Sequence, residues 1–240
     1  MIYHISMKLE KISIETLRQK IYEQLKQKII SAEILPGEVI TINGLAREFG
    51  VSLIPVREAL WQLESEKIII IRSNRNICVN NLSAKEMEEA LRIRLILESD
   101  AAEKACDHVP DAELPKIKHL LDDMEASIDN NRRFLSLNTQ FHFAIYSYSD
   151  SPLLLHIINW LWARIGPYLY ITGEKGRDHS VSMKCHQKMF EALLARHKLD
   201  LKKWLCEDLN QAASFIVPRL GDANVTGELP HLATKSQPKR

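Results

Sequence analysis

Polar residues interrupt the apolar helical stripes in the C-terminal half of this sequence, where they could act as metal ligands. Asn138 and His142 are four residues apart and share a stripe with Phe141. His186 and Asp208 lie on the apolar faces of two later segments. Buried polar groups cost free energy unless they pair with one another, a metal or a ligand. Amide, imidazole and carboxylate donors suit a divalent metal such as zinc or nickel, so these four polar residues predict a metal site.

An arginine and a glutamate one helical turn apart add to this polar group. Arg94 and Glu98 fall on the inner face of the segment that opens the C-terminal half. A guanidinium binds a carboxylate through two parallel hydrogen bonds, which favours an organic acid as the ligand. We therefore expect an effector pocket lined by Arg94, Glu98, Asn138, His142 and His186. The alternative for each histidine is a hydrogen-bonded position in the core or a place on the rim.

A second set of candidate residues lies in the N-terminal part and suits contacts with DNA. After Ser52, four apolar residues recur at helical spacing: Val56, Ala59, Leu60 and Leu63. If this stripe packs inward, then Leu53, Ile54 and Arg57 face outward, as does Trp61. The amide-rich start of such a helix can enter the major groove, where Arg57 could contact a guanine edge or a phosphate. The alternative is that Arg57 pairs with a neighbouring glutamate.

These outward residues require a helix-turn-helix to position them. Residues 12–30 predict an amphipathic helix that ends at a proline-glycine turn, and residues 42–66 predict two shorter helices joined through Gly50. Glycine permits the sharp reversal, and the Ser52 hydroxyl is expected to cap the second of these helices. Pro55 falls in the first turn of that helix, where its missing amide is harmless.

A β-hairpin is predicted directly after these helices. Residues 68–71 and 77–79 are short apolar runs, separated by a polar turn that contains Arg75 and Asn76. A hairpin in this place is the wing of a winged helix-turn-helix. Arg75 could then reach the minor groove or the DNA backbone, or it could simply be solvated.

The C-terminal half, from residue 82 to about residue 220, follows only the helical period. A capping box from Ser83 to Glu86 opens its first helix, which runs to about Cys106. Further helices are predicted in residues 111–130, 132–149, 152–167, 180–197 and 199–218. The segment 153–170 is apolar around nearly its whole circumference, so it is either core or packed against a second subunit.

Length and composition indicate a globular protein of two domains. The 240 residues are 45% hydrophobic and 26% charged, and no apolar run approaches the roughly 20 residues of a membrane span. The first residues lack a signal-peptide pattern, and the four cysteines form no CxxC pair, so we expect a cytoplasmic protein. The predicted fold class is mainly α. It combines an N-terminal winged helix-turn-helix in residues 1–80, an all-α helical-bundle effector domain in residues 81–221, and a disordered tail in residues 222–240.

The run from residue 35 to residue 69 contains a proline-glycine turn, then LA-x-x-x-GVS, then PVREAL-x-x-LE. This signature resembles the DNA-binding domain of the GntR family of bacterial regulators. The resemblance implies DNA contacts at Asn43, Ser52, Leu53, Ile54, Arg57, Arg75 and Asn76. Family members usually carry arginines at the positions of Asn43 and Leu53, and many have glycine at that of Asn76. The operator is therefore expected to differ from the usual one, and Leu53 could contact a thymine methyl.

The C-terminal half carries a second resemblance in three motifs: R-x-x-L-E-x-x-A-A from Arg94, N-x-x-x-H from Asn138, and His186 ahead of further apolar residues. These motifs resemble the FCD effector domain of the FadR subfamily within the GntR regulators. Such domains often bind a metal through an Asp or Asn, three histidines and a small carboxylate. The resemblance implies Asn138, His142 and His186 as ligands, with Asp208 at the position of the third histidine. Some relatives lack metal and bind acyl thioesters or other molecules, which is the alternative.

Together these patterns predict a DNA-binding transcription regulator, not an enzyme, whose operator affinity changes when a small-molecule effector binds. A palindromic double-stranded DNA operator requires two copies of the DNA-binding domain, so a homodimer is expected. Both repression and activation are open. One alternative is a helical-bundle metalloenzyme, against which the missing repeat of Glu-x-x-His counts. The other alternative is a DNA-binding protein without an effector.

Overall fold

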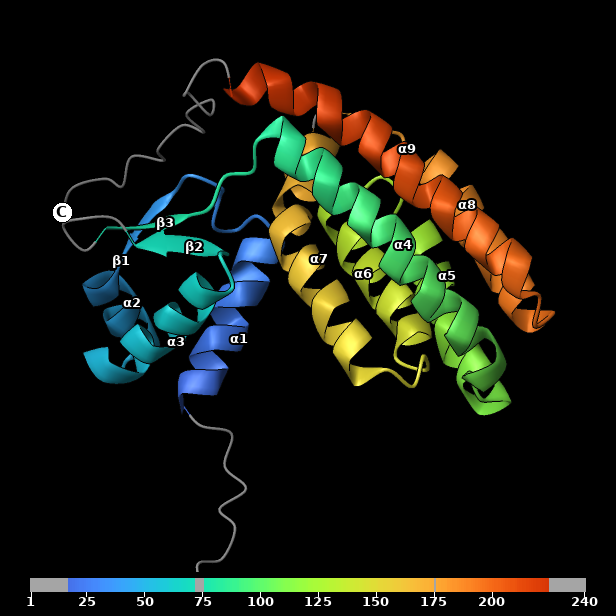
Figure 1. The fold of residues 1–240 in the computed structure, drawn as a ribbon, viewed down its shortest axis with the longest axis horizontal. Coiled ribbons are helices and arrows are strands. Elements are labelled where there is room, and N and C mark those ends of the chain that lie inside the picture. The colour runs from blue at the N-terminus through green and yellow to red at the C-terminus, as the bar shows by residue number, and fades with distance from the viewer. Residues whose placement is uncertain (1–16, 72–75, 175, 225–240) are drawn as a thin grey trace, which may run out of the picture.

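The computed structural model describes residues 17–71, 76–174 and 176–224, which form two domains with separate hydrophobic cores (Figure 1). The N-terminal domain is blue to teal in Figure 1, and the C-terminal domain, green to red, consists of helices in its described part. This is the predicted fold class, a winged helix-turn-helix followed by an all-α helical bundle. None of the helices described here is both long enough and apolar enough to cross a membrane.

The N-terminal domain contains three helices and a three-stranded antiparallel sheet. The helices are α1 (Leu17–Ile30), α2 (Ile42–Phe49) and α3 (Leu53–Ser65). The strands are β1 (Val39–Thr41), β2 (Ile69–Ile71) and β3 (Asn76–Val79), in the order β1-β3-β2. The register places Val39 opposite Cys78 and Ile69 opposite Val79. Residues 12–16 of the predicted first helix lie outside the described residues.

The turn between α2 and α3 has the backbone that a helix-turn-helix requires. Gly50 ends α2 with a φ of 65°, in the left-handed region that glycine adopts without strain. Ser52 occupies the N-cap position of α3, with φ −69° and ψ 165°, but its side chain makes no capping hydrogen bond. The predicted serine cap is therefore wrong. A capping hydroxyl binds the amide of the second or third helical residue, and the third residue here is Pro55, which has no N–H.

Six α-helices form the described part of the C-terminal domain. They are α4 (Ala84–His108), α5 (Leu114–Glu125), α6 (Asn131–Tyr146), α7 (Pro152–Gly173), α8 (Ser180–Leu194) and α9 (Lys198–Asn224), with a 3-10 turn at Asp111–Glu113 before α5. The predicted capping box opens α4. The amide of Glu86 donates to Ser83 Oγ over 3.2 Å, and the amide of Ser83 donates to Glu86 Oε2 over 2.9 Å.

Two helices continue past prolines that were predicted to end them. Pro167 lies inside α7, and Pro218 lies inside α9, which runs on through residues 222–224 of the predicted tail. Later parts of that tail lie outside the described residues. Proline removes one backbone hydrogen bond from a helix, but Leu169 and Leu220 are buried beyond the two prolines. Burial of these side chains offsets the lost hydrogen bond, because tertiary packing provides most of a helix's stability.

Helix α7 contributes to the cores of both domains. Leu161 is buried in the C-terminal core, whereas Ala163 lies in the core of the N-terminal domain. Gly166 approaches α1 so closely that a Cβ there would stand 2.9 Å from Ile30 Cγ2. Two faces of α7 are thus buried in the two cores, whereas Leu153 near its start is 71% exposed.

Two hydrogen bonds join α7 to segments at the boundary between the domains. The indole nitrogen of Trp160 donates to the carbonyl oxygen of Glu66, just after α3, over 2.7 Å. The amide of Leu82, just before α4, donates to the Tyr168 hydroxyl over 2.6 Å. Helix α7 is thus tied to the chain on both sides of the wing.

Candidate nucleic-acid interface and candidate metal centre

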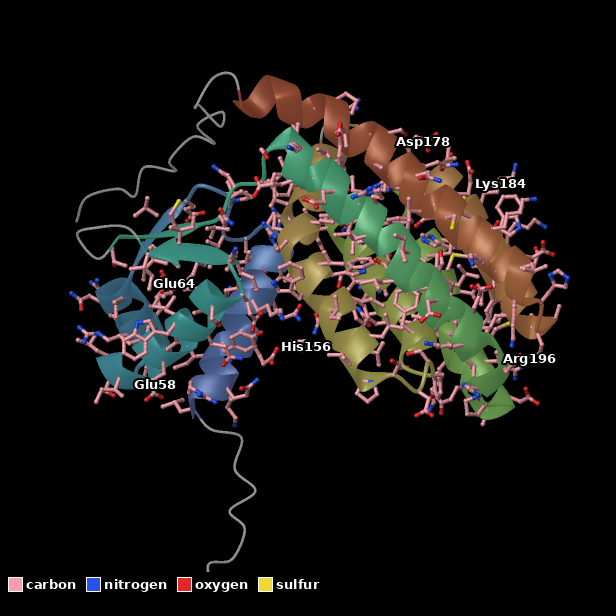
Figure 2. All side chains as sticks on the ribbon, viewed as in Figure 1. Glu58, Glu64, His156, Asp178, Lys184 and Arg196 are labelled. Carbon is pink, nitrogen blue, oxygen red and sulfur yellow. The ribbon has the colours of Figure 1, made fainter. Side chains whose placement is uncertain are left out.

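Helix α3 presents an outward face of the kind that its sequence predicted. Its apolar stripe is at most 1% exposed and consists of Val56, Ala59, Leu60 and Leu63. On the other side, Leu53 is 39% exposed, Ile54 68% and Trp61 61%. Arg57 is exposed as well, and Glu58 next to it lies on the outside of the domain (Figure 2). The predicted orientation of α3 is confirmed.

Arg57 is available for contacts outside the chain. Its guanidinium makes no hydrogen bond or ion pair with any other described residue, so the alternative in which it pairs with a glutamate is not observed. Asn43 on α2 and Ser52 at the start of α3 are also exposed. Arg47, in the last turn of α2, is exposed and likewise unpaired within the described residues. The sequence analysis missed it because it occupies a variable position of the LA-x-x-x-GVS motif.

The two predicted wing residues are described only in part. The backbone of Asn76 begins β3 and pairs opposite Thr41. Arg75 lies outside the described residues. Their contacts with DNA stay predictions.

Three of the four predicted metal ligands converge in the middle of the C-terminal domain. His142 from α6, His186 from α8 and Asp208 from α9 are 0%, 0% and 4% exposed. His142 Nε2 lies 3.1 Å from His186 Nε2 and 3.4 Å from Asp208 Oδ2, and His186 Nε2 lies 3.5 Å from Asp208 Oδ1. A zinc ion with ligands at about 2.0–2.1 Å has tetrahedral edges of ~3.3 Å, so these separations suit one shared cation. Asn138, also buried, lies one turn before His142 on α6.

Hydrogen bonds determine which nitrogen of His142 carries the proton. Tyr146 donates its hydroxyl proton to Glu98 Oε2 over 2.8 Å, so its oxygen accepts a hydrogen bond from His142 Nδ1 over 2.9 Å. In the neutral ring, a proton on Nδ1 leaves Nε2 with a lone pair, and Nε2 is the atom that faces Asp208. Metal-binding histidines commonly donate through their other nitrogen in this way. His186 differs, since its buried Nδ1 has no hydrogen-bond partner among the described residues.

Burial and charge have opposite effects at this centre. Burial lowers the pKa of His142, which favours its neutral ring. Burial alone would raise the pKa of Asp208, but the facing rings of His186 and His142 hold it well below the usual range. The Ser182 hydroxyl also donates a hydrogen bond to Asp208. An ionised carboxylate beside a neutral imidazole is a donor set that fits a divalent cation.

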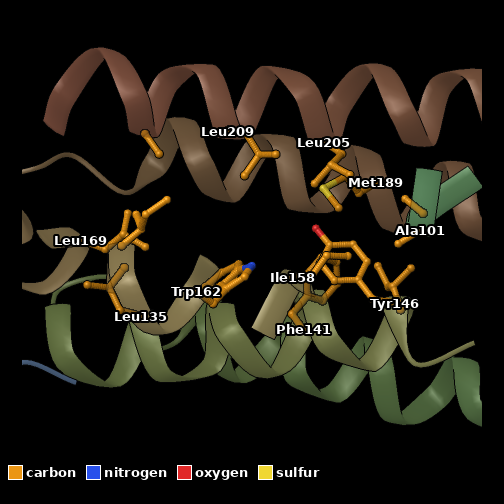
Figure 3. Packing of buried hydrophobic residues seen from close by; sticks show 14 of the residues in the cluster. Ala101, Leu135, Phe141, Tyr146, Ile158, Trp162, Leu169, Met189, Leu205 and Leu209 are labelled. Carbon is orange, nitrogen blue, oxygen red and sulfur yellow. The ribbon is translucent and has the colours of Figure 1, made fainter. Parts of the chain in front are cut away.

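A second buried polar cluster, around Glu98 on α4, adjoins this centre through Tyr146. Arg94 Nε donates to Glu98 Oε1 over 2.5 Å, and Trp162 Nε1 donates to the same oxygen over 3.1 Å. The Arg94 guanidinium lies 4.4 Å from the centre of the Trp162 ring. In Figure 3, the Tyr146 hydroxyl and the Trp162 indole nitrogen both point into the space between the packed helices. Arg94 therefore already pairs with a carboxylate of the protein itself.

The sequence analysis missed two residues of this site, Tyr146 and Trp162. Tyr146 follows His142 by four residues, so its helical spacing could have placed it on the same inner face. Trp162 gave no such signal, because the segment around it is apolar on nearly all sides. Its hydrogen bond to Glu98 depends on how α7 packs against α4, which periodicity within one helix does not reveal.

A winged helix-turn-helix with an exposed third helix, joined to a helical domain, defines a DNA-binding transcription regulator. Comparison with protein families identifies the family of regulators to which it belongs. Residues 17–79 match the model described as bacterial regulatory proteins, gntR family, and residues 89–211 match the FCD domain. The chain belongs to the GntR family and carries the FCD domain of its FadR subfamily.

Known relatives agree with this assignment. The chain is 27% identical over 208 residues to the HTH-type transcriptional regulator McbR of Escherichia coli (strain K12), covering 84% of this chain and 93% of McbR. It is 30% identical over 199 residues to the HTH-type transcriptional regulator YdhC of Bacillus subtilis (strain 168), covering 79% and 86%. The gluconate operon transcriptional repressor of Bacillus licheniformis is 29% identical over 181 residues, covering 75% and 72%. The solved structure of E. coli McbR/YncC matches with a TM-score of 0.81 and 25% identity, covering 86% and 99%. The chain is a transcription regulator and not an enzyme.

Proposed function

We propose that the chain acts in the cytoplasm as a homodimer on a palindromic operator, and that an organic acid bound in the FCD domain changes its operator affinity. The observation that carries this proposal is the convergence of His142, His186 and Asp208 in the middle of that domain. Well-packed apolar residues would stabilise a helical core at least as well as buried ionic groups, so folding alone does not require them. One relative is named for the operon of gluconate, an organic acid, and is named a repressor.

The second part of the proposal is a zinc or nickel ion held by His142, His186 and Asp208, with Asn138 as a fourth candidate. His142 offers the lone pair of Nε2, and Asp208 offers an ionised carboxylate. A divalent ion bound there would supply positive charge that attracts the carboxylate of an organic acid. Arg94 is buried nearby, but its charge is paired with Glu98, so the metal ion would supply the unpaired positive charge.

Helix α7 gives the effector site a physical connection to the DNA-binding domain. Trp162 donates to Glu98 in the polar cluster, and the next residue, Ala163, lies in the core of the N-terminal domain. A cleft of about 750 Å³ separates parts of α1 from α6 and α7 and is lined in part by Trp162. A ligand changes operator affinity only if it binds two arrangements of these domains with different affinity.

Metal content and gel-shift titration test the proposal. Elemental analysis of purified protein is expected to find about one zinc or nickel per chain. The Asp208→Asn variant, which removes a ligand charge with little change of volume, should lose most of this metal. Glu207→Gln, at the exposed neighbouring position of α9, should retain it.

Gel shifts with operator DNA then measure the effect of candidate acids, gluconate among them. We expect at least one acid to change DNA affinity by about 5- to 150-fold, the usual range of coupling between sites. Removal of the metal by a chelator should abolish that response. A protein without metal whose DNA affinity is unaffected by every acid tested would contradict the proposal.

A further inference from the structure

Two aliphatic side chains occupy the exposed tip of α3. Leu53 is the first residue of this helix and is 39% exposed, and Ile54 follows it with 68% exposed. Neither is needed for the core of the domain, because Val56 and Leu60 on the opposite face are already fully buried. The start of the third helix is the part of a winged helix-turn-helix that enters the major groove. These two side chains therefore lie where base edges are read.

Few polar side chains adjoin the two aliphatic residues along the chain. Ser52 precedes them, and Pro55 after them has neither an amide proton nor a polar side chain. Arg57 lies on the same outward face one turn further along the helix and remains free to donate hydrogen bonds. Leu53 and Ile54 themselves can neither donate nor accept hydrogen bonds from their side chains.

The major groove offers few partners for such side chains. Guanine, cytosine and adenine show hydrogen-bond donors and acceptors along their major-groove edges, whereas thymine also shows its C5 methyl group. We infer that Leu53 and Ile54 read thymine methyl groups, so that the operator carries T·A pairs at the positions that face the start of α3. This inference rests on the DNA-binding activity of the family and goes beyond it, since it specifies a base.

In vitro selection with the full chain and duplexes of random sequence is the first step of the test. We expect thymine to be enriched at fixed positions of the selected site. Selection with Leu53→Arg should replace thymine by guanine at one of these positions, because arginine binds the O6 and N7 of guanine. If the wild-type site shows no thymine preference where Leu53→Arg changes the selected base, the inference is overturned. Failure to enrich any duplex would count against DNA binding itself, and the inference would fall with it.

Replacement of thymine by uracil in the selected duplex is the second step, because it removes only the methyl group. Binding of the wild-type protein should weaken about fourfold for each methyl group removed from the interface, the effect expected for one buried methyl. When the replaced thymine is the one that Leu53 contacts, Leu53→Ala should bind the thymine and uracil duplexes with nearly equal affinity. Leu153→Ala, which truncates a 71% exposed leucine on α7, should keep the wild-type difference.

Two results of this second step would overturn the inference. One is wild-type affinity that does not change with uracil at any enriched position. The other is a Leu53→Ala protein that retains the full difference between thymine and uracil. Thermal unfolding of each variant provides the folding control, since position 53 is exposed and alanine is favourable in helices.

Discussion

The Tyr146 hydroxyl links Glu98 to His142, so the variant Tyr146→Phe removes two hydrogen bonds inside the core. Tyr146 is 0% exposed, and phenylalanine keeps its ring in place. His142 Nδ1 would lose its acceptor, and Glu98 Oε2 would keep only the Arg94 Nη2 donor at 3.4 Å. A buried polar group without a partner costs ~1–3 kcal/mol. Because His142 Nδ1 loses its only partner and Glu98 Oε2 loses one of two, we expect the free energy of unfolding to fall by about 2–4 kcal/mol.

Urea denaturation of the full chain measures this loss, with Tyr148→Phe as the matched control. Tyr148 is half-buried, and its hydroxyl makes no hydrogen bond within the described residues, so its removal should cost under about 0.5 kcal/mol. Metal titration gives an independent result. Because the bond from Nδ1 to Tyr146 orients the His142 ring, Tyr146→Phe should weaken metal binding by about 10- to 100-fold, and Tyr148→Phe should not. Equal stability losses in the two variants, with metal affinity unchanged, would refute the reasoning.

Three further predictions concern the DNA-binding face, the domain boundary and pH. Arg57→Ala should weaken operator binding in gel shifts by about 1–3 kcal/mol. Arg92→Ala, on the exposed side of α4, should leave binding unchanged. Equal binding by the two variants would rule out a role for Arg57. Gly166→Ala should lower the free energy of unfolding, measured by thermal unfolding, by about 1–3 kcal/mol, because its Cβ would stand 3.1 Å from the carbonyl oxygen of Ile30. Unchanged stability would show that α1 can shift to make room for the methyl group. Burial lowers the pKa of His179 to about 4, below the unfolded value of about 6.5, so this residue's contribution to stability is complete above pH 6.5 and is lost as pH falls towards 4. Urea midpoints of His179→Gln should therefore fall less between pH 7 and pH 5 than those of the wild type, and parallel curves would contradict the assignment.

Local patterns predicted much of the fold because they act within a single helix or turn. The stripe beside Arg57 and the capping box at Ser83 were both correct, since each depends on residues no more than a few positions apart. The predictions failed where a distant segment decides the outcome. Pro167 does not end α7 because the residues beyond it are buried by other helices. Strand β1 was not predicted, because three residues are too few for alternation to show, and its pairing with β3 stabilises it.

At the candidate metal centre too, helical spacing predicted which residues face inward, but not which of them meet. Inward placement of His142 and His186 followed from their helical stripes, and both are fully buried. That they face each other at 3.1 Å depends on the packing of α6 against α8, which no stripe specifies. Arg94 was expected to offer its guanidinium to a ligand, yet in the structure it donates to Glu98, one turn further along the same helix. The spacing of Arg94 and Glu98 could have predicted that contact, because residues four apart on a helix are neighbours.

The position of α7 limits how the two domains can influence each other. Consecutive residues on a helix point about 100° apart, so Trp162 and Ala163 face different neighbours although they share one backbone. Under the proposed function, a ligand that moved Glu98 would therefore act on α7 through the Trp162 indole. Such a shift would reach α1, because Gly166 packs so closely against Ile30 that a Cβ there would stand 2.9 Å from Ile30 Cγ2. Since α1 packs against α3 in one core, α3 would then change its placement together with α7.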